Sequence, residues 1–474
     1  MIDRTYGAWS LALFYACLPS LSCASGYNFG TQSASAESVA NASGAEAADA
    51  STVYFNPAGM SLLHGNHFSQ VLDVVLPSVS FHPQGQATAN VGGQFVPIQG
   101  DGGGTPISTT VVPHAYLTHE IDDRYSVGLG IFVPFAAKLA YDSNFVGRFY
   151  GTETSLETTT INPSLSIRLS EHDSIGLGLD AQYMFGALTR SVYGPAYAYG
   201  LSPSLAPAVS AAYAQGAMDP YANIHGSNWG YGYNLGFLHS FDDDTRVGLA
   251  YRSAIRENLH ARETLGNTAG LQANLIAQGL PAALVHAAPT SAPAQVRIVT
   301  PESVSLNCWH RLNERWAVMA DTTWTRHDRL QDLNILALPI ANTSISLPWK
   351  NTWKASVGLS YQLSTALQLR TGYMFDQSPT GANPGVFPTM PDNNRQWFSG
   401  GATYAINANN SIDLAISYWK IDSRSLYRTY DSATQADIPA NASALSGSGS
   451  SQGQLSGRVD SRALAIGLQW NATF

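Results

Sequence analysis

The last twelve residues of the chain, 463-ALAIGLQWNATF-474, decide its fold, because large apolar and small or polar residues alternate along them. Leu464, Ile466, Leu468 and Trp470 fall on one face of an extended chain, and alanine, glycine and amide residues fall on the other. Alternation with a period of two predicts a β-strand, whereas an amphipathic helix repeats about every 3.6 residues. The segments 127–135 and 412–418 alternate in the same way.

The composition indicates where such strands would be stable. Only 12% of the 474 residues are charged, about half of the roughly 25% that is usual in soluble domains. The chain nevertheless has no run of about 18 apolar residues that would predict a membrane-spanning helix. A transmembrane β-barrel explains both observations, because its apolar residues occupy alternate positions. The 11% of aromatic residues excludes disorder, and the sequence pattern excludes a collagen-like chain. The net charge of −9 excludes a strongly basic nucleic-acid-binding protein.

Tight polar turns divide the chain into pairs of alternating segments from about residue 66 onward. Six such turns are predicted, at 121–124, 170–174, 242–246, 312–315, 363–366 and 407–411. With one strand near 67–82 and a last one at 458–474, we expect an all-β fold of fourteen antiparallel strands, an even number as in bacterial barrels. If both termini are periplasmic, the longer loops at 83–110, 191–228, 262–297 and 425–457 lie outside. A soluble β-sandwich is the alternative, but it needs no apolar outward stripe on every strand.

The N-terminus predicts export from the cytoplasm. Residues 1–24 read as a signal peptide, because the apolar stretch at 9–21 is too short to span a bilayer and small residues follow it. A retained N-terminal anchor is the alternative. Cleavage would remove Cys17 and Cys23 and leave Cys308, so no disulfide is expected. We therefore place the mature chain in the outer membrane of a Gram-negative bacterium, with residues 64–474 as the barrel.

Residues 25–63 do not alternate and are predicted to fill the barrel. They are mostly small and polar, and Asn56-Pro57 with Gly59 predicts a specific turn. A barrel of about fourteen strands encloses a lumen that wall side chains alone cannot fill. An N-terminal plug explains both features, and a disordered linker is the alternative.

The triplet Asn56-Pro57-Ala58, after a small-residue N-terminus, resembles the plug, or hatch, of the FadL/TodX family. These are outer-membrane transporters of long-chain fatty acids and aromatic hydrocarbons. Further matching stretches follow in order along the mature chain: 133-VPF-135, 146-VGRF-149, 161-INPSL-165, 229-WGYG-232, 251-YRS-253, 301-PES-303, 375-FDQSP-379 and 391-PD-392 with Arg395. The resemblance implies passive uptake, with capture by the outer loops, a site in the lumen, plug movement, and lateral exit at a kink in the third strand.

The stretch that matches the kink is 132–141, and Pro134, Phe135 and Ala136 are the expected kink residues. Proline cannot donate to a β-ladder, so Pro134 independently predicts a local break. The family often has glycine in the kink, whereas this chain has alanine at 136 and 137.

Counting parity along the strands predicts which charges face the lumen. These are Asp180, Arg190, Arg246, Arg252, Arg256, Lys354, Arg370 and Asp376. Each is either half of a structural ion pair or a ligand contact, because an unpaired charge inside the wall is costly. The ligand-binding candidates are Arg190, Asp376, Arg252 and Lys354. The resemblance implies a head-group role for Arg190 and a family match for Asp376. A family head-group lysine has no counterpart here, which favours uncharged hydrocarbons.

The sequence shows no catalytic pattern, since it has no nucleophile elbow and no His-x-x-x-His metal pair with an acid between. We therefore expect no enzyme, cofactor or metal. An outer-membrane hydrolase or acyl transferase, and an adhesin, are the alternatives. The expected partners are a hydrophobic small molecule, outer-membrane lipid and lipopolysaccharide, and the barrel assembly machinery. The aromatic C-terminus, Phe474, resembles the signal that outer-membrane barrels present to this machinery. No nucleic acid partner is expected, and the chain should be a monomer.

Overall fold

The computed structural model describes residues 28–337, 341–381, 386–428 and 452–474. The predicted signal peptide at 1–24 lies outside these residues, as do the first residues of the predicted plug.

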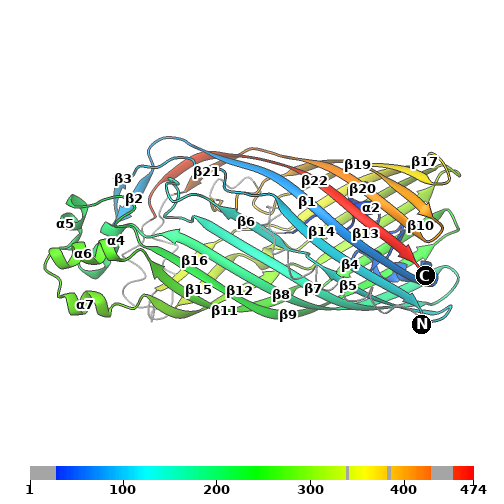
Figure 1. Cartoon of the computed structure of the whole chain (residues 1–474), viewed down its shortest axis with the longest axis horizontal. Coiled ribbons are helices and arrows are strands. Elements are labelled where there is room, and N and C mark those ends of the chain that lie inside the picture. The colour runs from blue at the N-terminus through cyan, green and yellow to red at the C-terminus, as the bar shows by residue number, and fades with distance from the viewer. Residues whose placement is uncertain (1–27, 338–340, 382–385, 429–451) are drawn as a thin grey trace, which may run out of the picture.

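The described strands close into one antiparallel barrel of fourteen wall strands (Figure 1). The barrel closes where β1 (Asn66–Pro83) pairs with β22 (Leu455–Thr473), from His67↔Thr473 to Pro83↔Gly457. In wall order the other strands are β4 (Thr110–Glu120), β5 (Tyr125–Phe132) with β6 (Ala136–Ala140), β7 (Glu153–Arg168), β8 (Asp173–Ser191), β9 (Tyr221–Ser240), β10 (Thr245–Arg252) with β11 (Ile255–Gly266), β13 (Ser303–Arg311) with β12 (Ser291–Thr300), β14 (Trp316–Thr325) with β15 (Asp332–Ala337), β17 (Thr352–Gln362) with β16 (Ala341–Ser346), β18 (Leu367–Asp376), β19 (Arg395–Asn407), and β20 (Asn410–Ile421) with β21 (Arg424–Arg428). The predicted all-β barrel of fourteen strands is confirmed.

Alternation along the strands separates the outer surface from the lumen. On β22, Leu464, Leu468 and Trp470 are exposed on the outside, whereas Ala465 and Gln469 are fully buried. Sheets alternate in this way because successive side chains point to opposite faces. The outer face of this part of β22 is therefore apolar, and its inner face is small or polar.

Tryptophan residues near strand ends suggest aromatic girdles at the two membrane interfaces. Only some of them lie on the outer face. Trp316, Trp353 and Trp470 are exposed on the outer face. Trp397 is 1% exposed and stacks on Trp419 with ring centroids 4.1 Å apart. It lies on the inner parity of β19, against Gly30 of the N-terminal segment.

The seventh wall strand reverses its parity between β10 and β11. Arg252 faces the lumen at the end of β10, two residues intervene, and β11 begins with the buried Ile255. As a result Arg256 is exposed on the outside and Glu257 is buried inside. The prediction that Arg256 faces the lumen is wrong, because a two-residue interruption cannot be seen in the apolar pattern.

The end of the barrel opposite the C-terminus, called the outer end below, carries short helices and a hairpin (Figure 1). They are α4 (Gly194–Leu201), α5 (Ala206–Ala211), α6 (Ala269–Ala277), α7 (Ala282–Ala287), and β2 (Thr88–Val91) with β3 (Gln94–Pro97). They fall in the stretches expected to be long outer loops. None of the described helices is long and apolar enough to cross a membrane.

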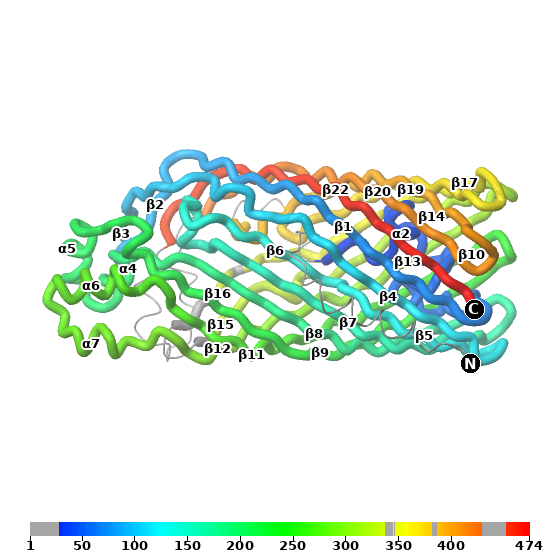
Figure 2. The backbone as a smooth tube through the Cα atoms, viewed as in Figure 1, coloured from blue at the N-terminus to red at the C-terminus, as the bar shows by residue number. Residues whose placement is uncertain are grey.

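The N-terminal segment, residues 28–63, lies inside the barrel (Figure 2). It contains α2 (Ala34–Glu37), α3 (Thr52–Phe55) and the 3₁₀ helix η2 (Pro57–Leu62). Helix α2 contacts β19, β20 and β22, and η2 contacts β7, β8 and β9 on another side of the wall. Most of its residues are buried, and their small side chains allow the segment to pack closely against the wall.

Candidate functional site

The third wall strand is broken at residues 133–135. Strand β5 pairs with β7 as far as Phe132↔Thr160, and β6 resumes the pairing at Ala136↔Glu157. Three residues therefore oppose two, as in a β-bulge, and Pro134 has no N–H to donate. Strand β4 pairs with β5 only as far as Ala115↔Ile131, and no ladder joins β4 to β6 in the described part of the wall.

The N-terminal segment bonds to the backbone of this break from the inside. The Phe29 N–H donates to the Pro134 carbonyl at 2.9 Å, and Gln32 Nε2 donates to the Val133 carbonyl at 2.7 Å. Asn28 also forms an antiparallel bridge with Phe135. Hydrogen bonds thus join the break to the N-terminal segment. Ala136, the first residue of β6 after the break, is fully buried.

A buried polar chain connects the same break to helix α2. The Val133 N–H donates to His114 Nδ1 at 3.3 Å, and His114 Nε2 lies 3.3 Å from Asp73 Oδ2. The Asp73 carboxyl lies beside Glu37, whose pKa is raised well above its usual value by burial and by the Asp73 charge. All three side chains are fully buried. The sequence gives no sign of this chain, because its members come from three distant segments.

The Asn56-Pro57-Ala58 turn is fastened to the wall. Asn56 caps η2, accepting from the Ala58 N–H at 3.1 Å, and its Nδ2 donates to the Phe237 carbonyl of β9 at 3.0 Å. The Ala58 carbonyl accepts from Ser166 and Ser174, each at 3.1 Å. A Cβ added at Gly236 would lie 2.1 Å from Asn56 Oδ1, so glycine is required for this close approach.

Arg252 is engaged by the wall and by the N-terminal segment together. Its Nη1 donates to both carboxylate oxygens of Asp180, at 3.0 and 2.9 Å, and its Nη2 donates to the Tyr54 carbonyl at 3.0 Å. The guanidinium also lies 4.8 Å from the centre of the Tyr54 ring. Arg252 therefore holds helix α3 against β8 and β10.

Several of the predicted site residues meet at one polar cavity of about 90 Å³ inside the barrel. Its lining includes Pro57, Pro134, Phe135, Arg252, Lys354 and Asp376. Lys354 is electrostatically coupled to Asp321, another lining residue. The turn, the break and three ligand-binding candidates thus share one volume, although they are far apart in sequence.

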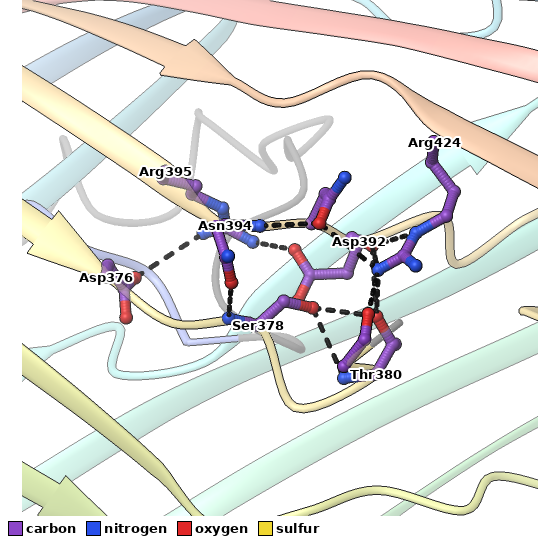
Figure 3. Close-up of polar contacts among 9 residues, drawn as sticks. Asp376, Ser378, Thr380, Asp392, Asn394, Arg395 and Arg424 are labelled. Atoms are coloured by element: carbon purple, nitrogen blue, oxygen red, sulfur yellow. Dashed lines mark hydrogen bonds and ion pairs between the residues drawn. The ribbon is translucent and has the colours of Figure 1, made fainter. Parts of the chain in front are cut away.

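Asp376 belongs to a network of ionic and hydrogen bonds beside this cavity (Figure 3). Arg395 Nη1 lies 4.0 Å from Asp376, and its Nη2 bonds Asp392. Asp392 also accepts from Ser378 at 2.9 Å, and its carbonyl accepts from Arg424. Arg395 is 1% exposed, so the network fixes its charge in place.

A second cavity, of about 40 Å³, lies further toward the outer end and is apolar. Its described lining is uncharged: Ala137, Thr154, Ser155, Leu156, Gly186, Ala187, Leu188, Ile224, Leu259, Val296, Ile298, Leu330, Leu333, Leu347 and Met390. Arg190 is not in this lining. It lies one inward position beyond Leu188 on β8, where it is electrostatically coupled to Glu263.

The outer helices enclose a third, larger cavity of about 580 Å³. Helices α4, α6 and α7 and the segments beside them line it, with leucines such as Leu201, Leu271, Leu275 and Leu284. Leu284 is 65% exposed, so the cavity opens to the outside. The three cavities lie at successive depths, from the outer helices to the break in the third strand.

The described residues include no group of three or more His, Cys, Asp or Glu side chains placed to hold a metal ion.

Comparison with known proteins gives a consistent result. A family model described as outer membrane protein transport protein (OMPP1/FadL/TodX) matches residues 15–474. A relative from Neisseria meningitidis serogroup B, named as an outer membrane protein, is 34% identical over 463 residues, which cover 95% of each chain. The long-chain fatty acid transport protein of Escherichia coli K12 is 26% identical and covers 79% of this chain and 83% of its own.

Two solved structures share the fold. A Pseudomonas aeruginosa FadL homologue superimposes with a TM-score of 0.78 at 23% identity, covering 94% of this chain and 99% of its own. The Pseudomonas putida toluene transporter TodX superimposes with a TM-score of 0.59 at 18% identity, covering 90% and 94%.

Proposed function

Because the chain belongs to the OMPP1/FadL/TodX family of outer-membrane transport proteins, we propose that it carries hydrophobic compounds passively across the outer membrane. The observation that carries this proposal is the uncharged cavity in the outer half of the lumen. An apolar solute gains about 25 cal/mol for each Å² that it buries there, without leaving a polar group unpaired.

The order of the cavities supports a path for the solute. The solute is captured among the outer helices, passes to the apolar cavity, and then meets the N-terminal segment. Residues 25–63 act as the plug, residues 1–24 as a cleaved signal peptide, and residues 64–474 as the barrel. Movement of the plug then opens the way to the kink at Pro134, Phe135 and Ala136, where the solute leaves sideways. The missing ladder between β4 and β6 in the described residues supports such an exit.

The charges of the lumen favour uncharged solutes such as aromatic hydrocarbons over fatty acids. Arg252 is paired with Asp180, and Arg190 is coupled to Glu263. Lys354 and Asp376 have charged neighbours in the polar cavity. Displacing such a partner to bind a carboxylate would leave a buried acid uncompensated, which costs several kcal/mol. In this proposal the solute path is lined by four charged side chains that favour an uncharged solute: Arg190, Arg252, Lys354 and Asp376.

The chain is not an enzyme in this proposal, and it needs no cofactor, because relatives that are named for an activity are long-chain fatty acid transport proteins. It works as a monomer within outer-membrane lipid and lipopolysaccharide, and Phe474 directs it to the barrel assembly machinery.

The proposal is tested by uptake of labelled toluene and of a labelled long-chain fatty acid into cells with and without the protein. We expect deletion to reduce toluene uptake more than fatty acid uptake. Unchanged uptake of both compounds would refute transport, and loss of fatty acid uptake alone would refute the preference for uncharged solutes. A variant that lacks residues 25–63 should leak small hydrophilic solutes, and a tight membrane would refute the plug.

A further inference from the structure

Three arginines point away from the lumen on one side of the barrel. Arg256 and Arg262 on β11 and Arg297 on β12 are exposed, and their neighbours in sequence on both strands are buried or half-buried. Arg297 lies opposite Asn258, so it stands between the two arginines of β11 along the strand direction. The three therefore form a row across two adjacent strands.

Aromatic side chains show the depth of this row in the membrane. Trp229 and Tyr183 are exposed on the outer face, with ring centroids 5.3 Å apart, and Phe241 is exposed at the opposite, tight-turn end of β9. The 12 residues from Trp229 to Phe241 span about 40 Å along a strand, or about 28 Å along the membrane normal at a tilt of about 45°. That is close to the roughly 25 Å height of the apolar band of such barrels, so Trp229 lies at the outer interface.

The arginine row crosses the level of this interface, with Arg262 beyond Trp229 and Arg256 on the side of the apolar band. Ser227, two residues beyond Trp229 on β9, pairs with His260, and His225 pairs with Arg262. His260 and His225 are themselves exposed. The row thus lies where the head groups of the outer leaflet begin.

The wall separates charges of opposite sign at this level. The acidic residues of β11, Glu257 and Glu263, are both buried on the lumen side. Within the described residues, none of the three arginines forms an ion pair with a carboxylate, and Arg262 donates only to Ser291, at 3.2 Å. Asp332, on the adjacent strand β15, is also exposed. Its single negative charge offsets only one of the three arginines, so the net charge of this face is positive. This row, together with His225 and His260, is called the arginine face below.

We propose that the arginine face binds the phosphorylated sugar head group of lipopolysaccharide in the outer leaflet. Guanidinium groups bind phosphate oxygens through two parallel charge-assisted hydrogen bonds, and they lose less solvation than ammonium groups when they do so. Basic clusters at the membrane surface of other proteins bind anionic head groups on the same principle. The proposal rests on the outer-membrane location of the chain and is independent of what the barrel transports.

The test compares wild-type protein with the triple variant Arg256→Gln, Arg262→Gln, Arg297→Gln. Both are purified in detergent and titrated with phosphorylated lipid A, with dephosphorylated lipid A, and with inorganic phosphate, while the unfolding temperature is recorded. We expect phosphorylated lipid A alone to stabilise the wild type. Each arginine should contribute about a fivefold gain in affinity, so the triple variant should bind about 100-fold more weakly. Heat-modified gel mobility checks that the variants are folded.

A matched control lies elsewhere on the same outer surface. The triple variant Lys420→Gln, Arg458→Gln, Arg462→Gln removes the same number of exposed cations, but Arg458 is already paired with Asp460 at 2.9 Å. This control should keep nearly all of the lipid A affinity. Equal loss in both triple variants would overturn the site, as would equal stabilisation by dephosphorylated lipid A or by inorganic phosphate.

The single variant Arg297→Gln provides the same test if the triple variant does not fold. It should weaken lipid A binding about fivefold, and unchanged affinity would count against the proposal. Toluene uptake by any folded variant should equal that of the wild type, which separates this proposal from the transport function.

Discussion

Arg370 on β18 and Glu46 in the N-terminal segment form an ion pair with two hydrogen bonds inside the barrel. Nη1 donates to Oε2 at 2.8 Å and Nη2 donates to Oε1 at 3.0 Å, and the two side chains are 4% and 10% exposed. Asp49 and Asp413 also lie close enough to Arg370 to interact with its charge. One wall arginine thus compensates several carboxylates of the segment and the wall.

Arg370→Gln should therefore destabilise the protein more than Glu46→Gln does. Loss of Arg370 leaves Glu46, Asp49 and Asp413 without that cation, whereas loss of Glu46 leaves Arg370 with two acids. Breaking a buried pair costs about 3–5 kcal/mol, and we expect this for Arg370→Gln. The measurement is the free energy of unfolding in urea, with antibiotic sensitivity of cells as a readout of leakage.

Arg311→Gln is the control for this experiment. Arg311 pairs with Asp244 in an exposed turn, with side chains 48% and 51% exposed. Its loss should cost less than about 1 kcal/mol and should cause no leakage. A reversed order of the Arg370 and Glu46 variants would contradict the assignment of Arg370 as the shared cation.

Asn56→Asp should loosen the N-terminal segment while keeping the shape of the side chain. The oxygen that caps η2 remains, but the donor to the Phe237 carbonyl is lost, and a charge is placed in a fully buried position. A buried group left without its partner costs about 1–3 kcal/mol, and more when it is charged. Limited proteolysis should cut the segment faster than in the wild type.

Asn313→Asp makes the same chemical change at an exposed turn. Asn313 uses its side-chain oxygen to accept from the Arg315 and Trp316 N–H groups, so aspartate can replace it. Proteolysis of this variant should match the wild type. If Asn56→Asp also matched the wild type, the bond from Asn56 to the wall would not hold the segment in place.

A disulfide between positions 28 and 135 should block exit reversibly. Asn28 and Phe135 form an antiparallel bridge, which places Cα atoms about 4.5–5.5 Å apart, within the range that a disulfide can span. In the double variant Asn28→Cys, Phe135→Cys, oxidation should lower toluene uptake severalfold and reduction should restore it.

The single variants Asn28→Cys and Phe135→Cys are the controls. Cys308, the free cysteine of the described residues, is half-buried on β13. Neither single variant should respond to oxidation. Full uptake by the cross-linked protein would show that the N-terminal segment does not have to leave the break for transport.

Val296→Trp should obstruct the apolar cavity. Val296 is 4% exposed and lines this small volume, so a larger side chain must occupy the path of the solute or displace its neighbours. We expect toluene uptake to fall by about tenfold or more, with an overpacking cost of about 1–3 kcal/mol.

Val357→Trp repeats the substitution on the outer surface. Val357 is 56% exposed on β17, and an aromatic side chain is readily accommodated on a lipid-facing surface. Its uptake should equal that of the wild type. Normal uptake by a folded Val296→Trp variant would place the solute path outside this cavity.

The period of the strands could be read directly from the sequence, because each side chain in a strand is assigned to one face by position alone. This rule places Leu464, Leu468 and Trp470 on the outer face, where the structure has them, and the turns determine the strand number. The inward positions of Arg252, Lys354, Arg370 and Asp376 followed in the same way. The rule failed at Arg256, where two residues between β10 and β11 reverse the alternation.

Partners could not be read from the sequence, because pairing depends on distance in space. Glu46 meets Arg370, Glu37 meets Asp73, and Asp180 meets Arg252 only after the barrel has closed around the N-terminal segment. Parity determined that a charge faces inward. Closure of the barrel determined which charge it meets, and therefore which cations remain available to a solute.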